Sequence, residues 1–266
     1  MKLAILYTSY RQFRELDYLP EMFRRAAQLR STASIIFHCN NAEISQPELA
    51  EKLAKIPCQS MDFIYAPQKN RGGYPYGQFE AIGDVWDKLA SHFDWVIHLH
   101  PDVFVMDEEP LLAALKKADS EKADILVTPT FGLKHPSFAT DFFAFRPDAV
   151  PRAVFESYRN FDRTTIVVPL ENLFFVEILR ARLNYSVAHR FAHGHYHRDI
   201  DQLGLWHEHD LRRMDLYRKK NWLRWLPTFG RCLRRPYLTT RFVLNWFNRK
   251  IRGQAQDTLA QQLTAL

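Results

Sequence analysis

The sequence predicts an α/β protein in which helices flank a mostly parallel sheet. Segments with the character of strands alternate with segments of helical periodicity through the first half of the chain, as in successive βαβ units. The apolar residues Trp95, Val96 and Ile97, followed by Leu99, are typical of a strand buried on both faces of such a sheet. The chain of 266 residues is long enough for one large domain, or for one domain with an appendage.

Local patterns predict the individual elements. Apolar residues at helical spacing predict the helix at 17–30, and Pro47 suits the first turn of a short helix at 47–56. Strands are expected at residues 2–10, 32–40, 61–67, 94–99, 123–129, 141–147 and 185–189. Further helices are expected at residues 79–90, 110–118, 151–158 and 170–183.

The composition is that of a soluble globular protein, at 47% hydrophobic and 25% charged residues. The three cysteines form no CxxC pair, which argues against a disulfide framework or a structural zinc site and fits a reducing compartment. The first residues are expected to form a strand rather than a signal peptide, and no apolar run approaches the length of a membrane span.

Positive charge is concentrated near the C-terminus. Residues 211–252 hold 13 Lys and Arg against the single acid Asp215, a local charge of +12, although the whole chain carries only +6. We therefore expect a domain at residues 1–210 and a basic, aromatic and helical segment at 211–266. Its eight interleaved aromatic residues suit an anionic membrane interface, and nucleic acid binding or packing against the body are the alternatives.

The strand at 94–99 ends abruptly at His100-Pro101-Asp102. Because Pro101 has no N–H to donate, regular strand pairing should stop there. An imidazole and a carboxylate are then left at the C-terminal end of a central strand, where open α/β sheets bind their ligands. His100 and Asp102 are consequently candidates for ligand binding.

A glycine-bearing loop precedes the helix at 79–90. Adjacent glycines let the backbone approach a ligand, the helix N-terminus favours an anion, and Arg71 could pair with a phosphate. The loop matches neither a Walker A motif nor GxGxxG, so a plain surface turn is the competing interpretation. Its sequence is Asn70-Arg71-Gly72-Gly73-Tyr74-Pro75-Tyr76-Gly77.

Six of the eleven histidines lie between His189 and His209. His-x-His spacing places both imidazoles on one side of an extended segment, as metal ligation often requires. A solvated turn is the alternative. We favour His207 and His209 as ligands, because the neighbouring Trp206 would anchor them.

The order of these features resembles that of GT-A fold glycosyltransferases: a strand, the Asn-Arg-Gly-Gly loop, a helix, and then a strand that ends in His-Pro-Asp. The resemblance covers residues 2–210 and places His100 where the first Asp of the DXD motif normally stands. It implies a Rossmann-type fold and transfer of a sugar from a nucleotide diphosphate sugar to a glycan or lipid-linked acceptor. It also implies a divalent metal, Mn²⁺ or Mg²⁺, at the diphosphate.

The resemblance also implies roles for individual residues. The metal would be held by Asp102, His207 and His209. Glu171, an acidic residue early in the helix at 170–183, would be the general base, with Asp141 as the alternative candidate. A purely structural interpretation of Glu171 is that the helix dipole stabilises its carboxylate. The nucleotide-sugar site would include Thr8, Ser9, Tyr10, Asn70, Arg71, Gly72, Gly77, His100 and Asp102.

Two other functions stay open on the sequence. A metal-dependent hydrolase could be built from the His-rich segment and Asp102, and a membrane-bound scaffold could have kept the fold without activity. For the transferase, we expect a cytoplasmic protein, peripheral on the inner face of the cytoplasmic membrane, that does not bind nucleic acid.

Overall fold

The computed structural model describes most of the first 214 residues. The described residues are 1–9, 13–40, 43–67, 76–90, 92–130, 137–157, 169–190, 200–209, 211 and 214. The chain divides into two units, Met1–Met214 and Asp215–Leu266. The second unit lies outside the described residues, and so does nearly all of the basic segment predicted at 211–266.

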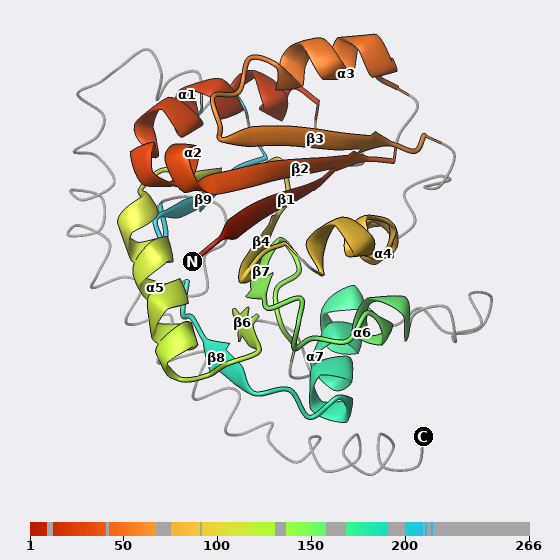
Figure 1. Ribbon diagram of the computed structural model, residues 1–266, viewed down its shortest axis with the longest axis vertical. Coiled ribbons are helices and arrows are strands. Elements are labelled where there is room, and N and C mark those ends of the chain that lie inside the picture. The colour runs from red at the N-terminus through yellow and green to blue at the C-terminus, as the bar shows by residue number, and fades with distance from the viewer. Residues whose placement is uncertain are drawn as a thin grey trace, which may run out of the picture. The chain divides into compact units, whose positions relative to one another are not determined.

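A seven-stranded sheet with the order β3-β2-β1-β4-β7-β6-β8 forms the centre of the first unit (Figure 1). All neighbouring strands are parallel except β7, which runs antiparallel to both β4 and β6. This confirms the predicted α/β class with a mostly parallel sheet. The strands are β1 (Leu3–Ser9), β2 (Ala33–Cys39), β3 (Ser60–Tyr65), β4 (Trp95–Leu99), β6 (Ile125–Val127), β7 (Phe142–Phe145) and β8 (Tyr185–Val187).

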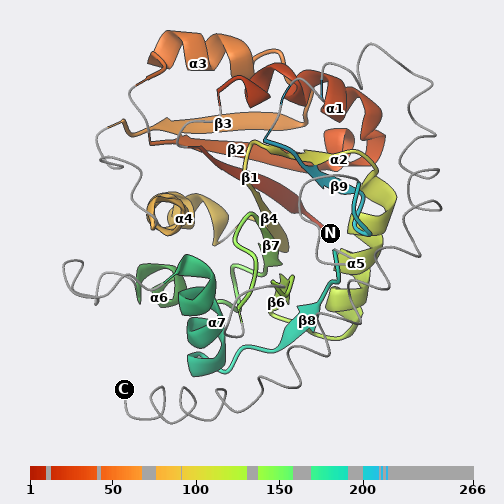
Figure 2. The same cartoon turned by 180° about the vertical axis from the view of Figure 1, so that it is seen from behind.

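Helices cover both faces of this sheet, with α4, α6 and α7 on one side and α1, α2 and α5 on the other (Figures 1 and 2). Within the described residues, no helix combines the length and the apolar character needed to cross a bilayer. The helices are η1 (Glu15–Asp17), α1 (Leu19–Arg25), α2 (Ala27–Thr32), α3 (Gln46–Leu53), α4 (Gly77–Leu89), α5 (Glu108–Ser120), α6 (Ala153–Glu156) and α7 (Leu170–Arg180).

The structure departs from the predicted elements in two places. The single helix expected at 17–30 is divided at Ala26, whose φ of −82° and ψ of 76° are not helical, so α1 and α2 are separate. Two short strands were not predicted: β5 (Val103–Val105) and β9 (Leu205–His207) pair as a separate antiparallel ribbon. Three-residue strands are too short to produce a recognisable alternation in the sequence.

An aromatic cluster fills the space between the sheet and α4, α6 and α7. Phe174 of α7, for example, has its ring centroid 4.6 Å from that of Phe143 and 5.4 Å from that of Phe79. This packing fixes the positions of α4 and α7, whose first turns contribute residues to the site described below. The principal rings are Phe79, Trp86, Phe143, Phe145, Phe155 and Phe174.

The reversed direction of β7 determines which residues meet at the carboxyl edge of the sheet. Strand β4 ends at this edge, whereas β7 begins there, with Leu99 paired to Phe142. The backbone N–H of His100 donates to the carbonyl of Asp141 over 3.1 Å. Asp141 is therefore brought next to the His-Pro-Asp turn that follows β4.

Candidate functional site

The β5–β9 ribbon brings the His-x-His pair against Asp102. Val103 pairs with His207, and the backbone N–H of Glu208 donates to the carbonyl of Asp102 over 3.0 Å. Because side chains alternate along a strand, His207 lies on the side opposite to Trp206, which is buried, and His209 follows just beyond the end of the strand. The ribbon thus joins the end of the β4 turn to a segment about a hundred residues later in the chain.

Three side chains at this ribbon form a group that could hold a cation. Asp102 Oδ2 lies 2.9 Å from His209 Nδ1 and 3.5 Å from His207 Nε2. The ligand atoms of all three residues lie within 4.8 Å of one another. Ligands at about 2.1 Å from a common ion are themselves about 3–3.5 Å apart, so this spacing fits a metal with modest adjustment.

The chemistry of the donor set also fits a divalent cation. Asp102 Oδ1 is buried and has no hydrogen-bond partner among the described residues, which leaves a carboxylate oxygen available. One carboxylate and two imidazoles suit Mn²⁺ better than Mg²⁺, because Mg²⁺ favours an all-oxygen shell. We therefore identify Asp102, His207 and His209 as a candidate metal site.

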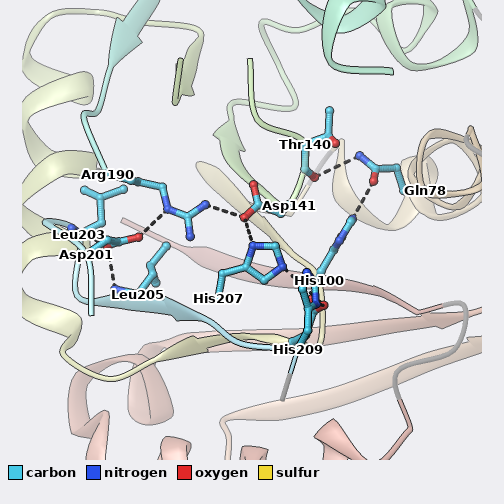
Figure 3. Close-up of polar contacts among 11 residues, drawn as sticks. Gln78, His100, Thr140, Asp141, Arg190, Asp201, Leu203, Leu205, His207 and His209 are labelled. Carbon is cyan, nitrogen blue, oxygen red and sulfur yellow. Dashed lines mark hydrogen bonds and ion pairs between the residues drawn. The ribbon is translucent and has the colours of Figure 1, made fainter. Parts of the chain in front are cut away.

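A chain of buried charges lies behind this site (Figure 3). His207 Nδ1 lies 3.0 Å from Asp141 Oδ2, and the same oxygen lies 2.8 Å from Nη1 of Arg190. Arg190 is only 1% exposed, and its Nε lies 2.6 Å from Asp201 Oδ2. The other oxygen of Asp201 accepts the N–H groups of Leu203 and Leu205, which fixes the turn into β9.

These contacts shift the pKa values of the buried groups. Burial alone would raise the pKa of Asp102, but contacts with His207 and His209 hold it well below its ordinary value. Burial opposes ionisation of Asp141 as well, yet Arg190 and then His207 hold its pKa far down. Burial lowers the pKa of His207, but Asp102 and Asp141 outweigh it and raise that pKa to about 9.

Asp141 was one of two sequence hypotheses for the general base, and that role stays a prediction. A carboxylate that accepts a proton during catalysis needs a pKa near the working pH. Asp141 is instead a fixed anion between Arg190 and His207, with the guanidinium at 2.8 Å. These contacts weigh against proton transfer by Asp141 and motivate the positioning role proposed below.

His100, which stands in place of a DXD carboxylate, is held by α4. Its Nε2 lies 2.7 Å from Oε1 of Gln78, whose Nε2 donates to the carbonyl of Thr140 over 3.1 Å (Figure 3). Burial lowers the pKa of His100, while the charges of Asp102, Asp141 and Glu171 act in the opposite direction. Glu171, half-buried in the first turn of α7, is thus close enough to influence the site.

The other predicted nucleotide-sugar residues are only partly described. Thr8 is 5% exposed, and its Oγ1 lies 2.9 Å from His98 Nε2, so this hydroxyl is engaged inside the protein. Ser9 is 1% exposed, and the Gly77 carbonyl accepts a hydrogen bond from Asn40. Outside the described residues lie Tyr10, Asn70, Arg71 and Gly72, as well as the His-rich stretch at 191–199.

Sequence reasoning did not find four residues that the structure brings to the site: Glu15, Gln78, Arg190 and Asp201. Burial and the charge of Asp102 raise the pKa of Glu15, which indicates that this carboxyl group lies near the metal candidate. No local pattern marks Glu15, Arg190 or Asp201. Of the four, Gln78 alone has a sequence feature that could have identified it, because it directly follows the glycine-bearing loop.

No family model matches the chain, and no curated protein sequence matches it. Several solved structures are similar to it. A protein of Desulfovibrio desulfuricans described as a nucleotide-diphospho-sugar transferase has a TM-score of 0.44 and 17% identity, over 71% of this chain and 80% of that one. The glycosyltransferase GlyE of Streptococcus pneumoniae has a TM-score of 0.47 and 11% identity, over 71% of this chain but 45% of that one. The 4-diphosphocytidyl-2C-methyl-D-erythritol synthase of Anaerococcus prevotii has a TM-score of 0.46 and 13% identity, over 71% and 88% of the two chains.

Proposed function

We propose that this protein is a metal-dependent glycosyltransferase that moves a sugar from a nucleotide diphosphate sugar to a glycan or lipid-linked acceptor. The observation that carries the proposal is the group of Asp102, His207 and His209 directly after the central strand β4. Open α/β sheets bind ligands at this edge. A divalent cation bound there would supply positive charge to the departing diphosphate.

Different residues of the chain would bind the cation and the phosphates. Asp102, His207 and His209 would hold the cation, and Gln78 contacts the ring of His100 near this group. The loop before α4, with Arg71, is our candidate for contact with the phosphates, because a helix N-terminus and a guanidinium both favour an anion.

Glu171 is our candidate for the general base that takes the proton of the acceptor hydroxyl if the reaction inverts the sugar. Its rival Asp141 is engaged by Arg190 and His207, as described above. Glu171 is half-buried at the start of α7, and its charge reaches His100. Among the described residues, no Lys or Arg forms an ion pair with Glu171, which supports its assignment as a base.

Thermal shift with nucleotides tests the proposed function. The full chain should be stabilised by one nucleotide among UDP, GDP, CMP and dTDP, and more strongly with Mn²⁺ present. A nucleotide at 100 times its dissociation constant should add about 2.7 kcal/mol to the free energy of unfolding. Asp102→Asn should lose the Mn²⁺-dependent part, whereas Asp148→Asn, which changes an exposed carboxylate paired with Arg146, should keep it.

Two results would count against the transferase. If none of the nucleotides stabilises the chain with or without Mn²⁺, the donor site is absent. If Mn²⁺ instead supports hydrolysis of ester or amide substrates in the absence of any nucleotide sugar, the metal site serves a hydrolase.

We also propose that the basic segment at 211–266 binds an anionic membrane surface, where a lipid-linked acceptor would be found, on the inner face of the cytoplasmic membrane. The support is its charge of +12 between residues 211 and 252 and its three tryptophans. Each Lys or Arg near such a surface adds roughly 1 kcal/mol of attraction. The full chain should float with anionic vesicles at low salt and not with zwitterionic ones; equal flotation with both would contradict an electrostatic contact.

A further inference from the structure

We propose that Asp141 is a positioning residue for the metal site: held in place by Arg190, it fixes the ring of His207 so that Nε2 faces the cation. This inference rests on the metal-dependent function proposed above. It adds Asp141 and Arg190, which are not themselves proposed ligands, to the residues that determine metal binding. Its support is the geometry of one imidazole between two carboxylates.

The two ring nitrogens of His207 face different carboxylates. Nδ1 lies 3.0 Å from Asp141 Oδ2, and Nε2 lies 3.5 Å from Asp102 Oδ2. An ionised carboxylate can only accept hydrogen bonds, so the nitrogen beside Asp141 keeps its hydrogen. Nε2 is then the ring nitrogen that faces the site formed with Asp102, and it is the atom through which His207 would hold a cation.

Arg190 keeps Asp141 in the state that this arrangement needs. Its Nη1 lies 2.8 Å from Asp141 Oδ2, the same oxygen that faces His207. Because a guanidinium is always charged in proteins, it holds Asp141 as an anion. Asp141 is therefore available as an anionic acceptor beside Nδ1 of His207. Carboxylates that orient metal-binding histidines in this way raise metal affinity and fix the tautomer.

The same guanidinium also links Asp141 to the backbone of β9. Arg190 Nε lies 2.6 Å from Asp201 Oδ2, and Asp201 Oδ1 accepts N–H groups from Leu203 and Leu205. His207 is the last residue of β9. Its backbone and its ring are thus positioned through one buried arginine, the backbone by way of Asp201 and the ring by way of Asp141.

Calorimetric titration with Mn²⁺ alone tests the inference on three full-length proteins. We expect Asp141→Asn to weaken Mn²⁺ binding about 10- to 100-fold, the usual effect of removing a partner of a ligating histidine. Asp84→Asn is the matched control, because it makes the same change at a carboxylate that also faces a histidine, with Asp84 Oδ2 3.0 Å from His38 Nε2, but that belongs neither to the metal group nor to the charges behind it. Its Mn²⁺ affinity should stay within about threefold of the original protein, well short of that 10-fold loss.

The outcomes separate this inference from the proposed function. If the original protein binds no Mn²⁺, both the metal site and the function built on it fail. If it binds Mn²⁺ and Asp141→Asn binds equally well, or if both variants lose affinity equally, only the role of Asp141 is overturned. Equal loss would mean that replacing a carboxylate beside a histidine weakens Mn²⁺ binding in general, and that Asp141 does not act through His207.

A second measurement uses the unaltered sequence, in case Asp141→Asn does not fold. Nitrogen-15 NMR of the histidine rings with diamagnetic Zn²⁺ should show His207 coordinating through Nε2 with its Nδ1 hydrogen retained. His209 is an internal control with the opposite pattern, because its Nδ1 faces Asp102 at 2.9 Å and should itself coordinate. Coordination of His207 through Nδ1 would overturn the inference.

Discussion

The aromatic face under α4, α6 and α7 and the charged edge around Asp102 are both buried, yet they are built in opposite ways. On the aromatic face, rings such as Phe143 and Phe174 pack with centroids 4.6 Å apart, and burial of apolar area stabilises the fold. At the edge, Arg190 is buried among Asp141, Asp201 and His207, where desolvation offsets much of the attraction between the charges. We interpret the second region as shaped by ligand binding and the first by stability.

Helix α7 belongs to both regions, which makes it a direct test of the comparison. Glu171 in its first turn acts on His100 at the edge, whereas Phe174, less than one turn later, is fully buried in the aromatic cluster. Substitutions at the two positions should therefore change different properties of the protein.

The largest expected effect is on turnover at Glu171. Glu171→Gln should lower kcat by about 10²- to 10⁴-fold if this residue takes the acceptor proton, with little change in donor affinity or Tm. Initial rates at saturating donor, with Tm measured in parallel, would show this. A normal kcat in the variant would remove Glu171 from the chemistry and leave the edge without a candidate base.

Arg190→Met should lower the free energy of unfolding by about 3–5 kcal/mol, because it leaves Asp141 and Asp201 buried without their partner. Denaturant titration measures this effect. The matched control is Arg146→Met, which breaks a pair with the exposed Asp148 at 3.2 Å and should cost less than about 1 kcal/mol. Similar losses of unfolding free energy in both variants would show that the buried ion pairs of Arg190 contribute no more to stability than the exposed pair of Arg146.

Phe174→Ala should also destabilise the protein by about 3–5 kcal/mol, through lost apolar contacts and the cavity left in the aromatic cluster. In contrast to Arg190→Met, it should leave the Mn²⁺ affinity of the folded protein unchanged. Calorimetry at a temperature where the variant is folded distinguishes the two. A parallel loss of metal affinity would mean that the two regions are coupled rather than separate.

The smallest effect expected is a pH dependence of metal binding at the edge. The pKa of His207 is raised to about 9 in the metal-free protein, so a cation must displace its proton at neutral pH. Mn²⁺ affinity should consequently rise about tenfold per pH unit up to about pH 9 from this residue alone. Titrations between pH 6.5 and 8.5 test the slope, and a flat profile would exclude His207 as a ligand.

The raised pKa of His207 should also make the metal-free protein less stable as the pH rises, whereas it makes metal binding stronger. A histidine whose folded-state pKa lies above its ordinary value stabilises the fold fully below about pH 6.5, and this contribution is lost as the pH rises through about 9. In the metal-free protein, Tm should therefore fall over that window, while the apolar contacts of the aromatic face contribute equally throughout.

The sequence was sufficient for features that depend on local pattern. The apolar residues before His100 predicted a buried strand, and Pro101 predicted its end; both follow from hydrogen bonding and burial within a few residues. The helix at 170–183 was similarly strong in the sequence and is observed as α7. The α/β class follows from the alternation of such segments.

The sequence was insufficient where distant residues determine the outcome. The partner of Asp141 is Arg190, 49 positions later, and no periodicity links the two. Thr8 has the composition of a ligand-binding strand end, but its hydroxyl is engaged by His98 from the neighbouring strand. Such choices depend on strand order and on the reversal of β7, which tertiary packing decides.

The β5–β9 ribbon also determines how early during translation the site can form. Asp102 and Asp141 leave the ribosome well before Arg190 and His207, so both carboxylates must stay hydrated while β1 to β4 are already able to pair. At about 5–20 residues per second, this interval lasts on the order of 5–20 s. A ribosome-bound chain that stops before β9 would carry most of the central sheet without His207 and His209, two of the three proposed ligands, so any metal loading would follow translation rather than accompany it.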